Sequence, residues 1–300
     1  KKMCEGCDKT IVECVRMSAD ESEVIAFLQR HGCFLSEREC TCGHKCTYNA
    51  KELRFRCRKR SENGVRCNIS FPLRRNTFFA QSKLGISKKF EFIIFWLSIA
   101  HPRQDLIIDE LNVSTHVVVD WGGACREVCI AVMLDRSYSL GGSGISVQIV
   151  EAKCGSKSNI IGRQIGPWVY GCYERETKKC FFEPVASRTS EALISLIRKR
   201  ILPGTRILMD YWRGYDPLLS EEDHEYLNIN HSVHFLDPHS LEVKNTERMW
   251  RDIRSGMPRC AKGEEHFLGY LAEQYWKRQH VRIKRLHYFL NDISTVYPPQ

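Results

Sequence analysis

The residues of this chain with the clearest capacity for chemistry are its cysteines. The sequence has 15 cysteines, and nine of them fall within the first 67 residues. The cleanest candidate ligands for a metal are Cys40, Cys42, Cys57 and Cys67. Four thiolates can hold a tetrahedral zinc ion, and Gly43 suits the tight turn that the first pair needs. Because the first residues lack the apolar core of a secretory signal, zinc is favoured over disulfides, and we predict a zinc ribbon within residues 40–67.

The spacing of the cysteines leaves other ligand sets open. His44 and Cys46 lie inside the predicted ribbon and compete with the four chosen cysteines. A second site could be built from Cys4, Cys7, Cys14 and Cys33. These four could equally be free thiols. Cys125 and Cys129 are one helical turn apart in an apolar stretch, so we interpret them as core residues.

Two acidic residues are candidates for metal-dependent chemistry. Asp210 ends an apolar run that reads as a buried strand, and Glu247 falls in the first turn of a predicted helix. Two carboxylates at one sheet edge, with a third from the first strand, could hold two divalent metal ions that activate a nucleophile and stabilise the leaving oxygen of a phosphodiester. Either residue also fits an ordinary strand end or helix start, so the pair alone does not define a site.

The elements that must position these carboxylates follow one another in an informative order. The predicted strands span 146–153, 167–173, 179–185, 206–210 and 226–230. The predicted helices of the same region span 190–200, with Ser190 as its cap, and 264–280, and another begins at Asn245. Three strands, a helix and a strand that ends in an acid is the order of an RNase H-like domain.

The front half of the chain reads as mostly helical. The predicted helices span 18–30, 88–100, 104–111 and 114–133, and 71–79 is expected to be extended. The turn at Asn112 between two of these helices fits a helix-turn-helix, although any helical hairpin gives the same outline. The glycines between 141 and 144 suggest a hinge to the rest of the chain.

Basic charge is concentrated in the first third of the chain. The formal net charge is +9, from 45 basic and 36 acidic residues. Residues 51–89 carry twelve Lys and Arg against two Glu, whereas residues 101–300 carry 26 basic and 25 acidic residues. A phosphate backbone is the natural partner of such a segment, although a solvated face or an import signal has the same composition. The predicted DNA-contacting residues are Arg54, Arg56, Arg58, Lys59, Arg60, Arg66, Arg74 and Arg75.

Composition excludes two broad classes of protein. With 43% hydrophobic and 10% aromatic residues, the chain can bury a core and is not wholly disordered. Its longest apolar run, residues 90–100, is shorter than the roughly 20 residues that cross a bilayer. We therefore expect a soluble, intracellular protein with no membrane partner.

An ordered series of short motifs resembles one family of transposases. The motifs in the second half are Trp168-Val-Tyr-Gly171, Glu174-Arg175, Pro203-Gly204-Thr205, Asp210-Tyr-Trp212, Asn230-His231-Ser232, Phe235-Leu-Asp237-Pro238 and Asn245-Thr246-Glu247. Those of the first half are Cys57, Asn76-Thr77-Phe78-Phe79, Asp120-Trp121 and Cys125-Arg126-Glu127. Together they resemble the Merlin-type DDE transposases and their bacterial insertion-sequence relatives over most of residues 20–285.

The resemblance implies specific roles for residues of the acidic site. Asp210 would be the second catalytic carboxylate, Glu247 the third, and His231 would sit near the Mg²⁺ or Mn²⁺ that the carboxylates bind. The family usually shows an Ile-Asp-Glu run on the first strand, and the matching residues here are Ile149-Val150-Glu151. Valine cannot bind a metal. Glu151 is only a weak substitute, because neighbouring strand residues point to opposite faces.

These observations predict an α+β or α/β protein in four parts. They are an N-terminal helical segment at 1–39, a basic zinc-ribbon module at 40–80, a helix-turn-helix-like domain at 81–140, and an RNase H-like, integrase-like catalytic domain at 145–290. The resemblance implies double-stranded DNA, such as terminal inverted repeats, as partner, a homo-oligomer, and a location in the nucleus or, outside eukaryotes, in the cytoplasm or nucleoid.

Three functional hypotheses remain, in decreasing order of preference. The first is a transposase-derived DNA-binding protein, decayed or domesticated by its host, whose strand cleavage is lost because Val150 replaces the first acid. The second is an active transposase that uses Glu151 or another acid. The third is a protein-interaction scaffold that binds neither DNA nor metal, which the clustering of basic residues disfavours.

Overall fold

The chain folds as a mixture of helices and sheets in two compact units. Unit 1 comprises Lys1–Gly122 and His280–Gln300, and unit 2 comprises Gly123–Gln279. The structure is a computed structural model, and it describes residues 7–60, 64–80, 83–135, 139–153, 158–160, 163–165, 168–174, 176–177, 179–185, 187, 189–210, 224–229 and 264–300. Within this described part, no helix is both long and apolar enough to span a membrane.

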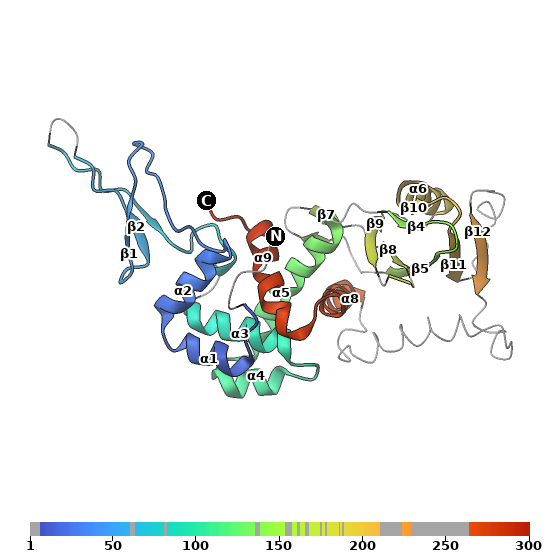
Figure 1. Cartoon of the computed structure of the whole chain (residues 1–300), viewed down its shortest axis with the longest axis horizontal. Coiled ribbons are helices and arrows are strands. Elements are labelled where there is room, and N and C mark those ends of the chain that lie inside the picture. Colours follow the sequence, from blue (N-terminus) through green and yellow to red (C-terminus); the bar gives the residue numbers. More distant parts are fainter. Residues whose placement is uncertain are drawn as a thin grey trace. The chain divides into compact units, whose positions relative to one another are not determined.

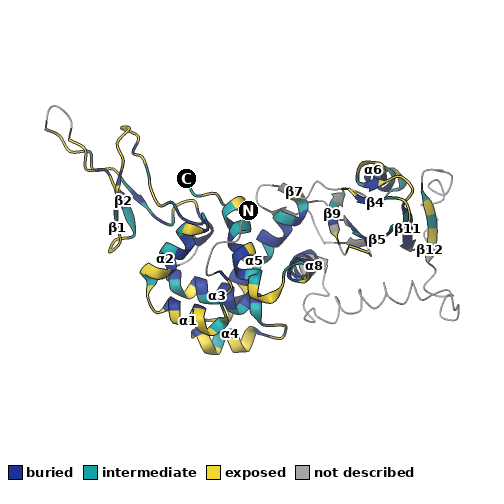
Figure 2. Ribbon diagram, in the orientation of Figure 1, coloured by how far each residue is buried: buried dark blue, intermediate teal, exposed yellow. Residues whose placement is uncertain are grey.

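Unit 1 is a helical bundle that carries a small sheet. Its helices are α1 (Ile11–Ser18), α2 (Glu21–Arg30), α3 (Ile86–Ser98), α4 (Gln104–Leu111), the start of α5 (Thr115–Asp135) and α9 (Arg285–Val296). Figure 1 shows α3 among the other helices, and α1, α2, α4 and α9 all contact it. Most residues of α3 are apolar and buried, although Lys88 is exposed, and much of the helix is dark blue in Figure 2.

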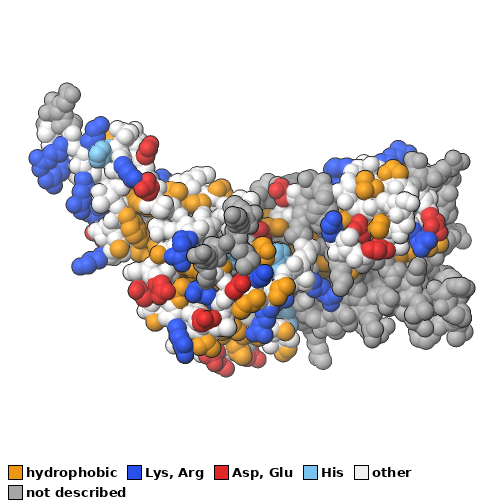
Figure 3. Space-filling model, viewed as in Figure 1, with side chains coloured by type: hydrophobic (Ala, Val, Ile, Leu, Met, Phe, Trp, Pro, Cys, Tyr) orange, Lys and Arg blue, Asp and Glu red, His pale blue; other side chains and the backbone are white. Residues whose placement is uncertain are grey.

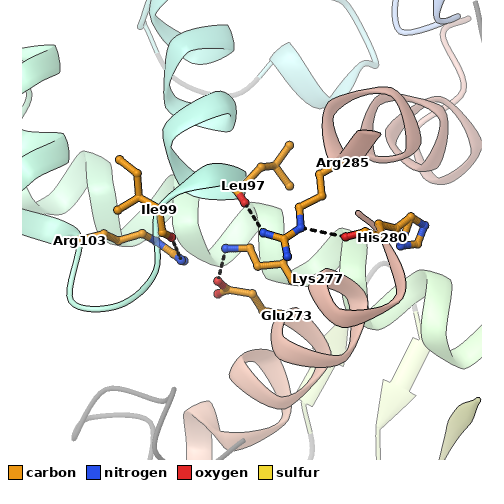
Figure 4. A network of polar contacts seen from close by, with 7 residues as sticks. All are labelled: Leu97, Ile99, Arg103, Glu273, Lys277, His280 and Arg285. Carbon is orange, nitrogen blue, oxygen red and sulfur yellow. Dashed lines mark hydrogen bonds and ion pairs between the residues drawn. The ribbon is translucent and has the colours of Figure 1, made fainter. Parts of the chain in front are cut away.

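Polar contacts fasten the C-terminal segment to unit 1. The Arg285 guanidinium donates from Nη1 to the Leu97 carbonyl at 3.0 Å and from Nε to the His280 carbonyl at 3.2 Å (Figure 4). The Trp96 and Phe289 rings pack with their centroids 5.4 Å apart. These contacts explain why α9, the last helix of the chain, belongs to the N-terminal unit.

Two sequence predictions for unit 1 are wrong in detail. The predicted helix 18–30 begins only at Glu21, because Asp20 caps α2 by accepting from Ser22 N at 2.8 Å, and the preceding helix α1, which a capping box of Thr10 and Glu13 starts, was not predicted. The segment predicted as extended, 71–79, begins in a strand but then turns into a 3₁₀ helix, Phe78–Ala80.

The side chain of Lys89 is buried inside unit 1. The residue has no exposed surface, its Nζ donates to the Phe79 carbonyl at 2.7 Å, and the same nitrogen lies 5.0 Å from the centre of the Trp121 ring. Burial lowers the pKa of Lys89 to about 8. Lys89 is therefore a core residue and cannot meet a phosphate, although the sequence placed it in the basic segment.

The stability of the protein is expected to reflect this buried charge. Below pH 8 both states carry the Lys89 proton; between pH 8 and 10.5 the unfolded chain still holds it and the folded chain does not, so stability rises with pH. The slope is at most about 1.4 kcal/mol per pH unit. The free energy of unfolding of Lys89→Met, measured by denaturant unfolding from pH 7 to 10, should lack this rise. An identical pH dependence of the variant would contradict a buried, titrating Lys89.

Unit 2 is built on a five-stranded sheet in the order β12-β11-β5-β8-β9. Its strands are β5 (Ser146–Lys153), β8 (Trp168–Glu174), β9 (Cys180–Val185), β11 (Arg206–Asp210) and β12 (Glu225–Ile229). β5, β8 and β9 form an antiparallel meander, and β11 and β12 join the other side of β5 as parallel strands. The first strand therefore lies at the centre of the sheet, and the five predicted strands agree with these five to within a residue or two.

Helices face the two sides of this sheet. The apolar residues of α6 (Ser190–Arg200) share one core with the alternate residues of β5 and β11, such as Ile149 and Met209. Strand side chains alternate between faces, so Tyr173 points away from the core that its neighbour Cys172 enters. The ring centroid of Tyr173 lies 6.3 Å from that of Tyr275 on α8 (Glu264–Gln279). A buried ion pair within α8 joins Lys277 and Glu273 at 2.7 Å (Figure 4).

Four further short strands escape prediction because each has only two or three residues. β4 (Leu140–Gly141) pairs with β10 (Ile201–Leu202), and β6 (Ser158–Ile160) pairs with β7 (Arg163–Ile165). The α6 cap is Thr189, not Ser190.

The segment predicted as a hinge is fixed within unit 2. Gly141 N donates to Glu174 at 2.6 Å, and Gly142 N donates to Thr205 at 2.8 Å. A Cβ on Gly141 would lie 2.1 Å from Thr205 Oγ1, so close packing requires glycine there.

Candidate metal centre and nucleic-acid interface

The predicted ribbon is a three-stranded antiparallel sheet with a very small core. Its strands, β1 (Thr47–Asn49), β2 (Arg54–Arg56) and β3 (Ser70–Pro72), lie in that order. Phe55 and Phe71 are registered partners and both are buried, and the Arg38 guanidinium lies 4.0 Å from the centre of the Phe71 ring. Two aromatic rings provide little stabilisation for a module of this size, which is the situation in which small folds use a metal.

The four cysteines predicted as ligands come together at the base of this sheet. Their sulfur atoms all lie within 4.8 Å of one another. Cys40 Sγ lies 3.8 Å from Cys67 Sγ, and Cys42 Sγ lies 3.5 Å from Cys57 Sγ. Zinc bonds to sulfur at about 2.3 Å, so two thiolates of one tetrahedral ion lie about 3.8 Å apart. The cysteines therefore already have nearly the separation that a zinc ion requires.

A tight turn presents the first cysteine pair. Gly43 N donates to the Cys40 carbonyl at 2.9 Å, and Gly43 has φ +73°, a left-handed conformation that suits glycine. A backbone hydrogen bond from Cys42 lowers the pKa of the Cys40 thiol to about 6, which favours the thiolate. Burial instead raises the pKa of Cys46, which is not part of the cluster. The competing residues His44 and Cys46 are thus not brought into the four-cysteine group.

The segment 57–67, which we call the basic hairpin, runs between the second cysteine pair. Cys67 N donates to the Lys59 carbonyl at 2.8 Å, and Arg60 and Arg66 face each other across the two arms. Its exposed cations are Arg58, Lys59, Arg60 and Arg66. Lys and Arg side chains gather on this projecting part of the ribbon in Figure 3. A metal bound by both cysteines would fix the base of an arm that carries a dense positive charge.

The other predicted DNA-contacting residues are less available. The Arg56 guanidinium forms an ion pair with Glu52, and Arg74 donates to the Leu84 carbonyl at 3.0 Å. Arg54 is half-buried on β2, whereas Arg75 is exposed. Four of the six exposed residues in the predicted set therefore lie on the basic hairpin.

The helix-turn-helix candidate carries the opposite charge. α4 and α5 are joined at Asn112, whose φ of +49° makes the turn. Residues 104–125 include no Lys or Arg, and their charged side chains are Asp105, Asp109, Glu110 and Asp120. A helix that reads a groove usually has cations near the phosphates, so this charge disfavours the predicted reading by the helix from Ser114.

The register of the sheet brings the first two acidic positions side by side. Ile149 on β5 pairs with Met209 on the parallel strand β11. Val150 and Asp210 are the next residues along these adjacent strands, and Val150 also pairs with Gly171 of β8. Glu151 is one register position further, opposite Tyr170. The predicted residues His231 and Glu247 lie outside the described residues.

The structure also assembles a group that sequence reasoning missed. Cys7 lies with His31 and His287, and neither Cys14 nor Cys33, which we grouped with it, is part of this cluster. Burial raises the pKa of the Cys14 thiol to about 11, and Cys33 Sγ donates to the Leu290 carbonyl at 3.4 Å. Cys4 lies outside the described residues. No local sequence signal links Cys7 to His287, because the two residues stand at opposite ends of the chain.

Comparisons with known proteins identify the class of this molecule. A family model described as the ISXO2-like transposase domain matches residues 128–279, just over half of the chain. The chain belongs to this family of transposase domains. It is also 28% identical over 112 residues to an uncharacterized transposase-like protein of Haemophilus influenzae, a match that covers 35% of this chain and 85% of that protein.

Proposed function

We propose that this chain is a transposase-derived DNA-binding protein of the DDE superfamily that has lost strand cleavage. The observation that carries the proposal is Val150, which stands next to Asp210 on adjacent parallel strands. That pair of positions is where the first two metal-binding acids of such an enzyme would lie. An isopropyl side chain has no lone pair for a metal ion, so one of the bridging ligands of a two-metal site is absent.

The sheet topology supports an RNase H-like assignment for unit 2. An antiparallel meander with its first strand in the centre, extended by two parallel strands, is the arrangement that the predicted order of elements requires. Asp210 ends the first of the parallel strands. Asp210 and Glu247 would be the remaining ligands for Mg²⁺ or Mn²⁺, which would supply the charge that stabilises the leaving oxygen of a phosphodiester. The Merlin-type motifs favour that branch of the superfamily and terminal inverted repeats as its DNA.

DNA binding is proposed for the ribbon. Its four cysteines suit structural zinc by type and by spacing, and the basic hairpin supplies exposed cations at one place on the surface. The acidic character of residues 104–125 leads us to assign the phosphate contacts to the hairpin and not to α5.

The test of this function combines binding and cleavage on duplex DNA. The purified chain, loaded with zinc, should bind duplex DNA with an affinity that falls steeply with salt, and should leave end-labelled DNA intact with Mg²⁺ or Mn²⁺. Cleavage that Glu151→Gln abolishes would establish the active enzyme instead, and absence of DNA binding would favour the interaction scaffold.

Removal of zinc is expected to unfold the ribbon and leave the helices of unit 1 intact. The small core around Phe55 and Phe71 cannot by itself offset the conformational entropy of some 30 ordered residues. A strong chelator should therefore abolish hydrogen-exchange protection in β1–β3, while α3 stays protected. Cys46→Ser should behave like the unaltered chain. Undiminished protection in the metal-free protein would argue against zinc as the organising element.

A further inference from the structure

Cys7, His31 and His287 form a second buried cluster, separate from the ribbon. Their potential ligand atoms lie within 4.8 Å of one another, and the residues are only 1%, 3% and 3% exposed. Cys7 lies before α1, His31 is the C-cap of α2, and His287 lies on α9. Three distant parts of the sequence thus deliver one sulfur and two imidazoles to one point in the core of unit 1.

The distances within the cluster suit a metal ion. Cys7 Sγ lies 3.1 Å from His31 Nε2, and the His31 and His287 ring centroids are 5.4 Å apart. Zinc bonds to sulfur at about 2.3 Å and to imidazole nitrogen at about 2.0 Å, so the two ligands of a tetrahedral ion lie roughly 3.5 Å apart. The Cys7 and His31 ligand atoms therefore need to separate by only a few tenths of an ångström to hold zinc.

A group outside the cluster contacts each imidazole: a backbone carbonyl for His31 and a side-chain amide for His287. His31 Nδ1 lies 2.8 Å from the Phe27 carbonyl, so this nitrogen carries the proton and Nε2, next to Cys7, has the lone pair. His287 Nε2 lies 2.9 Å from Asn291 Nδ2; with that amide turned over, its oxygen accepts from Nε2–H, and the lone pair of Nδ1 is left for a metal ion. A second hydrogen bond that fixes the ring and its tautomer is typical of metal-binding histidines.

We propose that Cys7, His31 and His287 bind a second zinc ion, which joins the N-terminal segment and α2 to the C-terminal helix α9. A thiolate with two imidazoles is a ligand set that zinc favours. These three ligands leave a fourth position for one more donor or for water.

The site requires reduced Cys7. In this structure Cys7 is disulfide-bonded, and a metal ion binds the thiolate. A phosphine such as TCEP supplies the two electrons that cleave the disulfide and becomes the phosphine oxide, with water supplying the oxygen and the two thiol protons. Zn²⁺ then displaces the proton of the Cys7 thiol.

The number of zinc ions per chain tests the proposal. The purified chain, folded and kept in TCEP, should contain two zinc ions by elemental analysis. Cys42→Ser with Cys67→Ser should reduce the content to one, and the further change His287→Gln should remove that last ion. His116→Gln, at an exposed position of α5, is the matched control and should keep it. One zinc ion in the reduced, unaltered chain would overturn the proposal.

A spectroscopic measurement guards against variants that fail to fold. Co²⁺ added to the reduced Cys42→Ser, Cys67→Ser chain, checked for helix content by circular dichroism, should give the intense visible bands of a four-coordinate site together with a thiolate charge-transfer band. A spectrum with only the faint absorption of hydrated Co²⁺ would overturn the second site, whatever His287→Gln does to folding. Neither readout depends on DNA binding, so it stands apart from the proposed function.

Discussion

Val150→Asp is expected to give this chain metal-dependent cleavage of DNA ends. The substitution adds a carboxylate at the position next to Asp210, where β5 and β11 run parallel and in register. With Glu247, it would complete the three acids that the resemblance implies. End-labelled duplex carrying a transposon end, incubated with Mg²⁺ or Mn²⁺, is the substrate, and strand scission on a denaturing gel is the measurement.

The expected effect is large because a bridging ligand acts on both metal ions. Loss or displacement of one ion removes several kcal/mol of transition-state stabilisation, and each 1.4 kcal/mol is about tenfold in rate. We therefore expect the variant to cleave at least about a thousandfold faster than the unaltered chain.

Two controls separate this explanation from others. Asp210→Asn in the Val150→Asp chain should return cleavage to background, because both acids must act together. Glu151→Gln in the Val150→Asp chain should have little effect, because the register puts Glu151 at a different position of β5. If the unaltered chain cleaves as fast as the variant, the missing acid is not the reason for inactivity.

The sheet and the four-cysteine group were predictable from the sequence because each rests on a local pattern. Alternating and continuous apolar runs identified β5, β8 and β11. The order of these elements, together with the acid at the end of β11, indicated the type of domain. The cysteine pairs gave four ligands directly, and the structure brings those four together.

Features that depend on contacts distant in sequence were not predictable. Nothing near His287 indicates that α9 returns to α2 and Cys7, because that packing is set by buried surfaces such as Trp96 against Phe289. Lys89 was counted with the basic residues of segment 51–89 for the same reason, because its burial depends on the positions of Trp121 and the Phe79 carbonyl. The predicted helix 18–30 starts later because Asp20 is the cap of α2.

Neutralising the basic hairpin should abolish most of the affinity for DNA. The variant changes four exposed cations to Gln: Arg58, Lys59, Arg60 and Arg66. Each phosphate contact contributes about 0.9 to the slope of log K against log salt, so loss of four contacts should lower that slope by roughly 3 to 4. We expect the affinity at low salt to fall by about two orders of magnitude, measured by fluorescence anisotropy on duplex DNA.

A matched variant decides whether position or total charge matters. Arg16, Arg278, Arg282 and Lys284 are cations outside the ribbon, and changing all four to Gln alters the net charge by the same amount. If the hairpin contacts phosphates, this control should keep nearly the full salt slope, because charges more than a Debye length of about 8 Å from the DNA are screened at physiological salt. Equal losses in both variants would mean that the DNA responds to the general positive field of the molecule. In that case the zinc ribbon would position no contact, and the assignment of DNA binding to the hairpin would fail even though the chain binds DNA.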